Sequence, residues 1–322
     1  MIRESGWTTP DLYVPGLLLI AIVVGRGRRF VRDWLPFLVL LLAYESLRGA
    51  VGSLNDRVHW TILAHLDSVL GFGQPVTERL QALLYRPGAD PLNLAVSLIY
   101  VLHFVVPLAV AFVLWWTDSR AYWRFASALL LVSFAGFVFF LVFPAAPPWM
   151  ASADGYIAPV HRVVTETLST IVHPGLVAYA WSRVGSNPVA PFPSLHAAWP
   201  TLVALTLWSR SRSRWRWLLF LYPAFVGFAV VYAAEHYLVD VLAGYAFAVA
   251  AFAIVEWVVQ RGQARARRTA TARLIETGGE PVLRFGAVGV WRSLVARLNG
   301  VQEVPGSNPG TPTRASASGT RR

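Results

Sequence analysis

The sequence predicts an all-α membrane protein, a polytopic helical bundle with about seven transmembrane helices. Of its 322 residues, 56% are hydrophobic and only 14% are charged, whereas soluble domains usually carry about a quarter charged residues. A spanning helix needs about 20 mostly apolar residues, somewhat fewer if flanking residues extend it. The chain has seven such stretches, at 11–25, 34–50, 92–116, 121–143, 195–209, 217–235 and 238–259.

Arginine clusters orient this bundle, because cytoplasmic loops near helix ends are enriched in positive charge. The clusters follow spans one, three and five, and consist of Arg26, Arg28, Arg29 and Arg32, of Arg120 and Arg124, and of Arg210, Arg212, Arg214 and Arg216. With seven spans, all three clusters lie on the cytoplasmic side. The N-terminus, the 51–91 and 144–194 loops and the turn around Glu235 then lie together on the extracytoplasmic side.

The two long outer loops contain more than linkers. Leucines recur at helical spacing within 57–86, and the stretch 160–172 is amphipathic, so interfacial helices are expected in both loops. The 144–194 loop is long enough to cap a site.

Composition divides the chain into a peripheral N-terminal transmembrane helix (1–33), a catalytic membrane domain (34–260) and a basic, disordered cytoplasmic tail (261–322). The tail holds 11 Arg against three Glu, and so supplies +8 of the net charge of +11. No basic stripe with interleaved aromatic residues appears, so nucleic-acid binding is not expected. Residues 288–313 can be back-translated into the arms of a tRNA, which suggests read-through of a tRNA gene; the nucleotide sequence of the gene would test this.

Two further features of composition restrict the chemistry and the source. The chain has no cysteine, which excludes disulfides, thiolate metal sites and cysteine nucleophiles. All 28 basic residues are Arg, a bias typical of a high-GC bacterium.

Two short segments bring reactive side chains to the same membrane depth. Pro193 to His196 lies at the outer mouth of span five, and His236 to Asp240 at that of span seven. In a helix, His236 and Asp240 share a face, so the carboxylate can fix the tautomer of the ring. A second imidazole can then protonate the oxygen that departs when the first attacks phosphorus.

Such a pair requires the two rings to lie within about 4–8 Å of each other, the reach of hydrogen bonds on either side of one phosphate. A histidine at a membrane interface can equally be an amphipathic surface residue. Spacing alone therefore leaves both interpretations open.

The segments 192–198 and 235–244 resemble the second and third signature motifs of the type 2 phosphatidic acid phosphatase superfamily. Leu195 and the His236-Tyr237 pair are similar to the inositol phosphorylceramide synthase branch of that superfamily. The resemblance covers about residues 40–258 and implies a six-helix phosphatase-type core formed by spans two to seven. Further matches to the branch are Arg48-Gly49, Leu66-Asp67, Tyr100 to Pro107 and Pro144 to Trp149.

The resemblance also implies a role for each motif residue. His236 is the nucleophile that becomes phosphohistidine, Asp240 orients it, His196 is the acid toward the leaving group, and Ser194 contacts the phosphate. Neither a metal nor another cofactor is implied.

The chain departs from the family pattern where that pattern supplies positive charge. The first family motif rests on a Lys, which this chain lacks, and Val230 stands where an Arg usually precedes the nucleophile. Arg48 is the first candidate to neutralise the phosphate, and Arg183 and Arg162 are weaker ones. Each can instead be a snorkelling or solvated side chain.

The expected function is that of a phosphotransferase or phosphatase in the bacterial cell membrane, acting on lipid phosphates or phospho-headgroups at the extracytoplasmic face. The donor is a lipid phosphate or phospholipid, and the acceptor is water or a polyol such as inositol. Two alternatives are a transporter or flippase, with Glu45 and His103 along its path, and a non-catalytic member of the fold. Uniformly apolar spans and the four motif residues favour the enzyme, whose catalytic set excludes His103.

Overall fold

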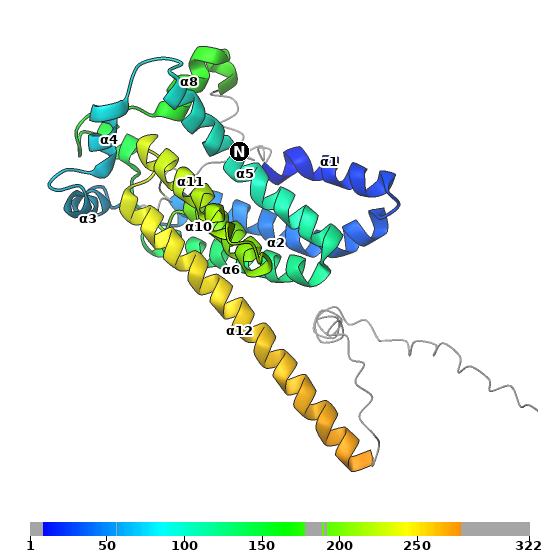
Figure 1. Ribbon diagram of the computed structural model, residues 1–322. Coiled ribbons are helices and arrows are strands. Elements are labelled where there is room, and N and C mark those ends of the chain that lie inside the picture. The colour runs from blue at the N-terminus through cyan, green and yellow to red at the C-terminus, as the bar shows by residue number, and fades with distance from the viewer. Residues whose placement is uncertain (1–8, 56, 178–188, 190–191, 278–322) are drawn as a thin grey trace, which may run out of the picture. The chain divides into compact units, whose positions relative to one another are not determined.

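The computed structural model describes residues 9–55, 57–177, 189 and 192–277, and these fold into helices without a β-strand (Figure 1). The predicted all-α class is therefore confirmed. Contacts divide the chain into two units, Met1–Val258 and Val259–Arg322. The helices are α1 (Thr9–Val23), α2 (Gly27–Leu54), α3 (Ile62–Leu70), α4 (Val76–Leu84), α5 (Pro91–Thr117), α6 (Ser119–Val142), α7 (Pro148–Ala153), α8 (Val163–Ile171), α10 (Leu195–Arg210), the 3₁₀ helix η1 (Arg216–Phe220), α11 (Leu221–Tyr232) and α12 (Leu238–Thr277).

A helix occupies each of the seven predicted spans, namely α1, α2, α5, α6, α10, η1 with α11, and α12. Among the described residues, α5, α6 and the part 238–269 of α12 are long and apolar enough to cross a membrane by themselves. α12 runs past the predicted end of its span at residue 259, so the first residues of the predicted tail continue this helix. The segment 288–313, with its read-through hypothesis, lies outside the described residues.

The three arginine-rich connections meet at one end of the bundle. Arg26 donates to the Trp116 carbonyl oxygen at 3.3 Å, and its guanidinium lies 4.1 Å from the Trp116 ring centroid. Arg210 forms an ion pair at 2.9 Å with Asp118, which also caps α6 by accepting from the Arg120 and Ala121 N–H groups. The connections after α1, α5 and α10 are thus joined to one another, in agreement with the predicted clustering of the arginines.

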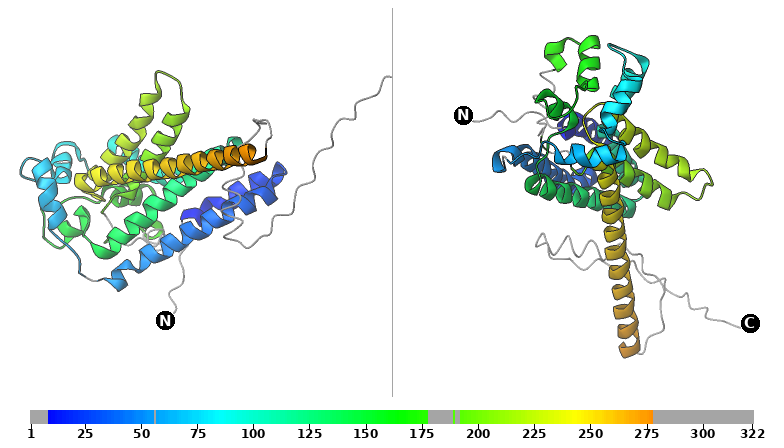
Figure 2. Two further views of the ribbon diagram at one scale, coloured as in Figure 1. Left: turned by 90° about the horizontal axis from the view of Figure 1, so that it is seen from below. Right: turned by 90° about the vertical axis from the view of Figure 1, so that its left-hand side faces the viewer.

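The other end of the bundle carries the short helices. There α4 packs against α11, α8 against α5, and α3 against α4 (Figures 1 and 2). Helices are therefore present in both long loops, where the sequence predicts them. Between the two ends, α5, α6, α10 and α11 pack on one another, α2 packs on α6, and α1 packs on α2.

Candidate active site

The start of α10 is fixed by the segment 192–198, which resembles the second signature motif of the family. Ser194 is fully buried, and its hydroxyl oxygen accepts the Ala197 N–H at 3.3 Å as the N-cap of α10. The Ser194 N–H donates to the Asp240 carbonyl oxygen at 3.0 Å, which ties this cap to the first turn of α12. His196, the second residue of α10, is therefore held beside α12.

A tight turn between α11 and α12 presents His236. Ala234 adopts the left-handed region at φ 63°, as a residue that terminates a helix often does. The N–H groups of Glu235 and His236 then both donate to the Val230 carbonyl oxygen, at 3.0 and 3.1 Å. The turn thus ties the backbone of His236 to the last turns of α11.

One sequence-based expectation about this turn is wrong. His236 does not share a helical face with Asp240, because α12 begins only at Leu238. Asp240 lies in the first turn of α12, where one carboxylate oxygen, Oδ2, accepts the Tyr237 N–H at 2.9 Å. The same oxygen lies 3.5 Å from His236 Nδ1, so the two side chains still meet.

The two motif histidines are in direct contact. His196 Nδ1 lies 2.9 Å from His236 Nε2, and the ring centroids are 5.0 Å apart, within the predicted range. His236 and Asp240 are 4% and 0% exposed, so their interaction is shielded from solvent. Asp240 therefore lies beside one ring nitrogen of His236, Nδ1, and His196 lies beside the other, Nε2.

Helix α5 contributes two further rings, which the catalytic set chosen from the sequence omits. The Tyr100 ring stacks on His196 with centroids 5.1 Å apart, and the His103 centroid lies 4.6 Å from that of His196. His103 is buried, and its Nδ1 makes no hydrogen bond among the described residues. The match of the Tyr100 to Pro107 stretch to the related branch is the sequence signal that could have identified both.

The candidate arginines lie in different surroundings. Arg48 donates to Glu45 Oε2 at 2.8 and 3.1 Å within α2. Arg162 donates to both carboxylate oxygens of Glu235, at 2.8 and 3.4 Å. Arg162 is thus connected to the residue before His236, whereas Arg183 lies outside the described residues.

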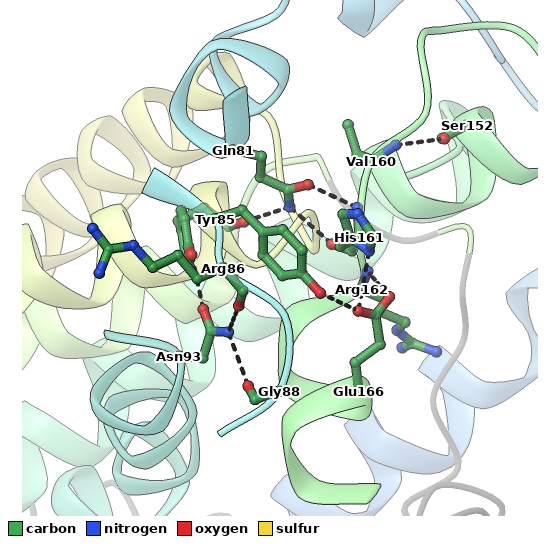
Figure 3. A network of polar contacts seen from close by, with 11 residues as sticks. Gln81, Tyr85, Arg86, Gly88, Asn93, Ser152, Val160, His161, Arg162 and Glu166 are labelled. Atoms are coloured by element: carbon green, nitrogen blue, oxygen red, sulfur yellow. Dashed lines mark hydrogen bonds and ion pairs between the residues drawn. The ribbon is translucent and has the colours of Figure 1, made fainter. Parts of the chain in front are cut away.

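Arg162 belongs to the 144–194 loop and is held in place there by a polar network (Figure 3). The backbone N–H of Arg162 donates to Glu166 Oε1 at 3.1 Å. The other carboxylate oxygen, Glu166 Oε2, accepts the Tyr85 hydroxyl at 2.8 Å. The guanidinium lies 4.1 Å from the Trp149 ring centroid. Because Glu235 directly precedes His236, this network joins the loop to the turn that carries the candidate nucleophile.

Gly244 permits the close approach of α12 to the cap of α10. A Cβ at this position would lie 2.2 Å from the Ser194 carbonyl oxygen, a backbone atom. Gly244→Ala should therefore force the two helices apart, at a cost of about 1–3 kcal/mol. A displacement of about 1 Å at the histidines should lower the rate of the reaction on the order of 100-fold.

Gly262→Ala is the matched control on the same helix, since a Cβ at Gly262 would meet no described atom within 4 Å. Thermal melting in detergent and the steady-state rate should distinguish the two variants. Equal melting temperatures and rates for Gly244→Ala and the unchanged protein would contradict this account of the helix crossing.

Comparisons with known proteins identify the family of this chain. The sequence profile of the PAP2 superfamily matches residues 61–254. The chain is 28% identical over 265 residues to the phosphoinositol dihydroceramide synthase of Bacteroides thetaiotaomicron, covering 78% of this chain and 85% of that relative.

A second relative is the inositol phosphorylceramide synthase catalytic subunit of Schizosaccharomyces pombe. Identity to it is 24% over 253 residues, which is 74% of this chain and 57% of that subunit. No solved structure matches the chain. The profile covers more than half of the sequence and includes both histidine segments, and the chain therefore belongs to the PAP2 superfamily.

Proposed function

We propose that the protein transfers a phospho-headgroup from a lipid donor to an alcohol through a phosphohistidine on His236, at the extracytoplasmic face of a bacterial cell membrane. Its family and its relatives support the broader assignment as a membrane lipid phosphotransferase or phosphatase. The observation that carries the proposal is the arrangement of Asp240, His236 and His196, with separations of 3.5 and 2.9 Å.

Asp240 determines which nitrogen of His236 attacks. A carboxylate beside Nδ1 favours the tautomer with the proton on Nδ1, and this leaves the lone pair on Nε2. That lone pair faces His196, so in the free protein the His196 Nδ1–H is the donor in the contact between the rings. The distance of 3.5 Å to Asp240 is long for a hydrogen bond, and such bonds often tighten when substrate binds.

The reaction then takes two displacement steps. In the first, His196 takes up a second proton as the anionic phosphate binds. His236 Nε2 then forms a bond to phosphorus, the bond from phosphorus to the lipid oxygen breaks, and the His196 imidazolium gives a proton to that oxygen, which leaves His196 neutral. In the second, the acceptor hydroxyl gives its proton to His196 and its oxygen attacks phosphorus. The nitrogen–phosphorus bond breaks, His196 releases the second proton as the product leaves, and both histidines return to their starting state.

Positive charge for the phosphate comes from several sources in this proposal. Arg48 and Arg162, each paired with a glutamate, stay candidates, and so does Arg183 on sequence grounds. The N-terminus of α10, beside His196, adds the partial positive charge of a helix end. Ser194 is proposed as a phosphate contact because its hydroxyl retains a proton to donate.

The acceptor is proposed from the names of the relatives. Both names describe the joining of an inositol phosphate to a ceramide, which is a lipid alcohol. We therefore place an alcohol ahead of water as the acceptor here, with an inositol-bearing headgroup as the first candidate for transfer.

A panel of substrates tests the function. Protein in liposomes should be given phospholipids with a ³²P-labelled headgroup and, in separate reactions, water alone, inositol or a ceramide. We expect label in a new lipid phosphodiester and, after quenching, in an acid-labile, base-stable adduct on His236. Chelators should leave transfer unchanged. Label that never enters the protein, or that vanishes with chelator, would rule out this mechanism.

The side of the membrane can be tested in cells, because the chain lacks cysteine. A single cysteine at Phe72, which is 85% exposed between α3 and α4, should react with an impermeant maleimide in intact cells, whereas one at Ser213, between α10 and η1, should react only after the membrane is permeabilised. Labelling at Ser213 from outside would reverse the proposed orientation.

A further inference from the structure

Asp67 is a fully buried acidic residue of α3, outside the predicted spans. Its Oδ2 accepts the Val76 N–H at 2.7 Å, and its Oδ1 accepts the Val239 N–H at 3.1 Å. Val76 is the first residue of α4, and Val239 is the second residue of α12. One carboxylate therefore caps two helices that are distant in sequence, at ends where unpaired N–H groups and the helix dipole favour an anion.

The hairpin formed by α3 and α4 reaches the same turn at two other points. The Thr77 hydroxyl lies 3.5 Å from the His236 carbonyl oxygen. Gln81 Nε2 donates to the Tyr232 carbonyl oxygen at 2.7 Å and to the His161 carbonyl oxygen at 2.8 Å, and Gln81 Oε1 accepts the His161 N–H (Figure 3). The hairpin therefore contacts the chain before, at and after His236.

The chemistry of Asp67 matches this placement better than a neutral cap would. A buried carboxylate is costly, and burial raises the pKa of Asp67 while its backbone N–H donors oppose that shift. An asparagine has one acceptor oxygen and a serine has one hydroxyl, so neither can accept through two oxygens aimed at two helices. Only an acidic side chain can join both helix ends in this way.

We propose that Asp67 is a positioning residue for the nucleophile: by capping α4 and α12 together, it fixes the turn on which His236 meets Asp240. The inference rests on the proposed function. Asp67 bonds to the backbone of α12 and acts through His236 and Asp240. Its loss should therefore impair the formation of the phosphohistidine and not the binding of the lipid.

The test compares Asp67→Asn with Asp118→Asn. Asp118 likewise accepts two backbone N–H groups at a helix start, but at the opposite end of the bundle. Asp67→Asn should lower kcat and the single-turnover rate of phosphohistidine formation about 100-fold, the effect of a misplacement near 1 Å, with KM for the lipid unchanged. Amide hydrogen exchange at Val76 or at Val239, whichever N–H loses its acceptor, should rise about tenfold, as expected for one lost hydrogen bond. Asp118→Asn should change neither.

Several results would overturn the proposal. These are a normal kcat for Asp67→Asn, a loss expressed only in KM, or unchanged exchange at both Val76 and Val239. Asp67→Ser, which can cap one helix, is the second variant and should show the same pattern. Failure of both variants to fold beside a folded Asp118→Asn would assign Asp67 a purely structural role. If the unchanged protein forms no phosphohistidine, the proposed function fails, whereas the exchange comparison still tests the positioning.

Discussion

Replacing His236 with alanine should abolish turnover of every donor. No other group at the site can form the covalent intermediate in the proposed mechanism, and loss of a nucleophile in a comparable covalent enzyme costs about 10⁶-fold in kcat. The measurement is headgroup transfer together with the ³²P adduct on the protein. Both should disappear, while the melting temperature in detergent stays close to that of the unchanged protein.

His196→Ala is the informative partner of this variant. His196 gives a proton to the leaving oxygen, so its removal matters in proportion to how poor the leaving group is. A nitrophenyl phosphodiester, whose leaving group needs no proton, should restore much of the rate, and the label should persist on His236. Label that survives in His236→Ala and is lost in His196→Ala would exchange the two roles.

Asp240→Asn should give the second-largest loss, about 10⁴-fold in kcat if it parallels the effect of a wrong imidazole tautomer in a catalytic triad. The variant keeps the size of the side chain but removes the charge that lies 3.5 Å from His236 Nδ1. His236 should then bear its proton on Nε2 more often and lose its attacking lone pair. Single-turnover labelling with a nitrophenyl phosphodiester measures this step.

Asp90→Asn provides the control for this substitution. Asp90 caps α5 by accepting the Leu92 N–H at 2.9 Å, so the same change removes a helix-capping charge away from the histidine pair. We expect little change in stability, because asparagine caps a helix about as well as aspartate does, and a normal rate of labelling. If Asp240→Asn labels as fast as Asp90→Asn, Asp240 does not set the tautomer.

The spans and the histidine pair could be predicted because both depend on local patterns. Apolar runs identify helices without knowledge of what packs on them, and every predicted span contains a helix. Alternation across seven spans also places residues 196 and 236 at one end of the bundle. The observed contact between the two imidazoles agrees with that placement.

The rest of the site depends on tertiary contacts that no short pattern contains. His236 leaves the helix because the N–H groups of the turn bond to the Val230 carbonyl oxygen, which spacing of four residues could not reveal. The pairing of Arg162 with Glu235 joins positions 73 residues apart, and Asp67 reaches Val239 across 172 residues. In the sequence, Tyr100 and His103 belong to an ordinary apolar span. Their contacts with His196 become visible only when α10 packs against α5.

In the free protein, His196 Nδ1 and His236 Nε2 lie 2.9 Å apart and bond to each other. In the proposed mechanism a phosphate must bind between these two nitrogens, so it has to separate the rings first. A phosphate exchanges this neutral contact, with a net value of about 0.5–1.5 kcal/mol, for bonds to a charged group worth about 1.5–3 kcal/mol each. A neutral lipid alcohol offers no comparable exchange. In the proposed mechanism, the contact between the two rings therefore favours binding of a phosphate-bearing donor before that of a neutral lipid alcohol, which binds as acceptor after the phosphohistidine has formed.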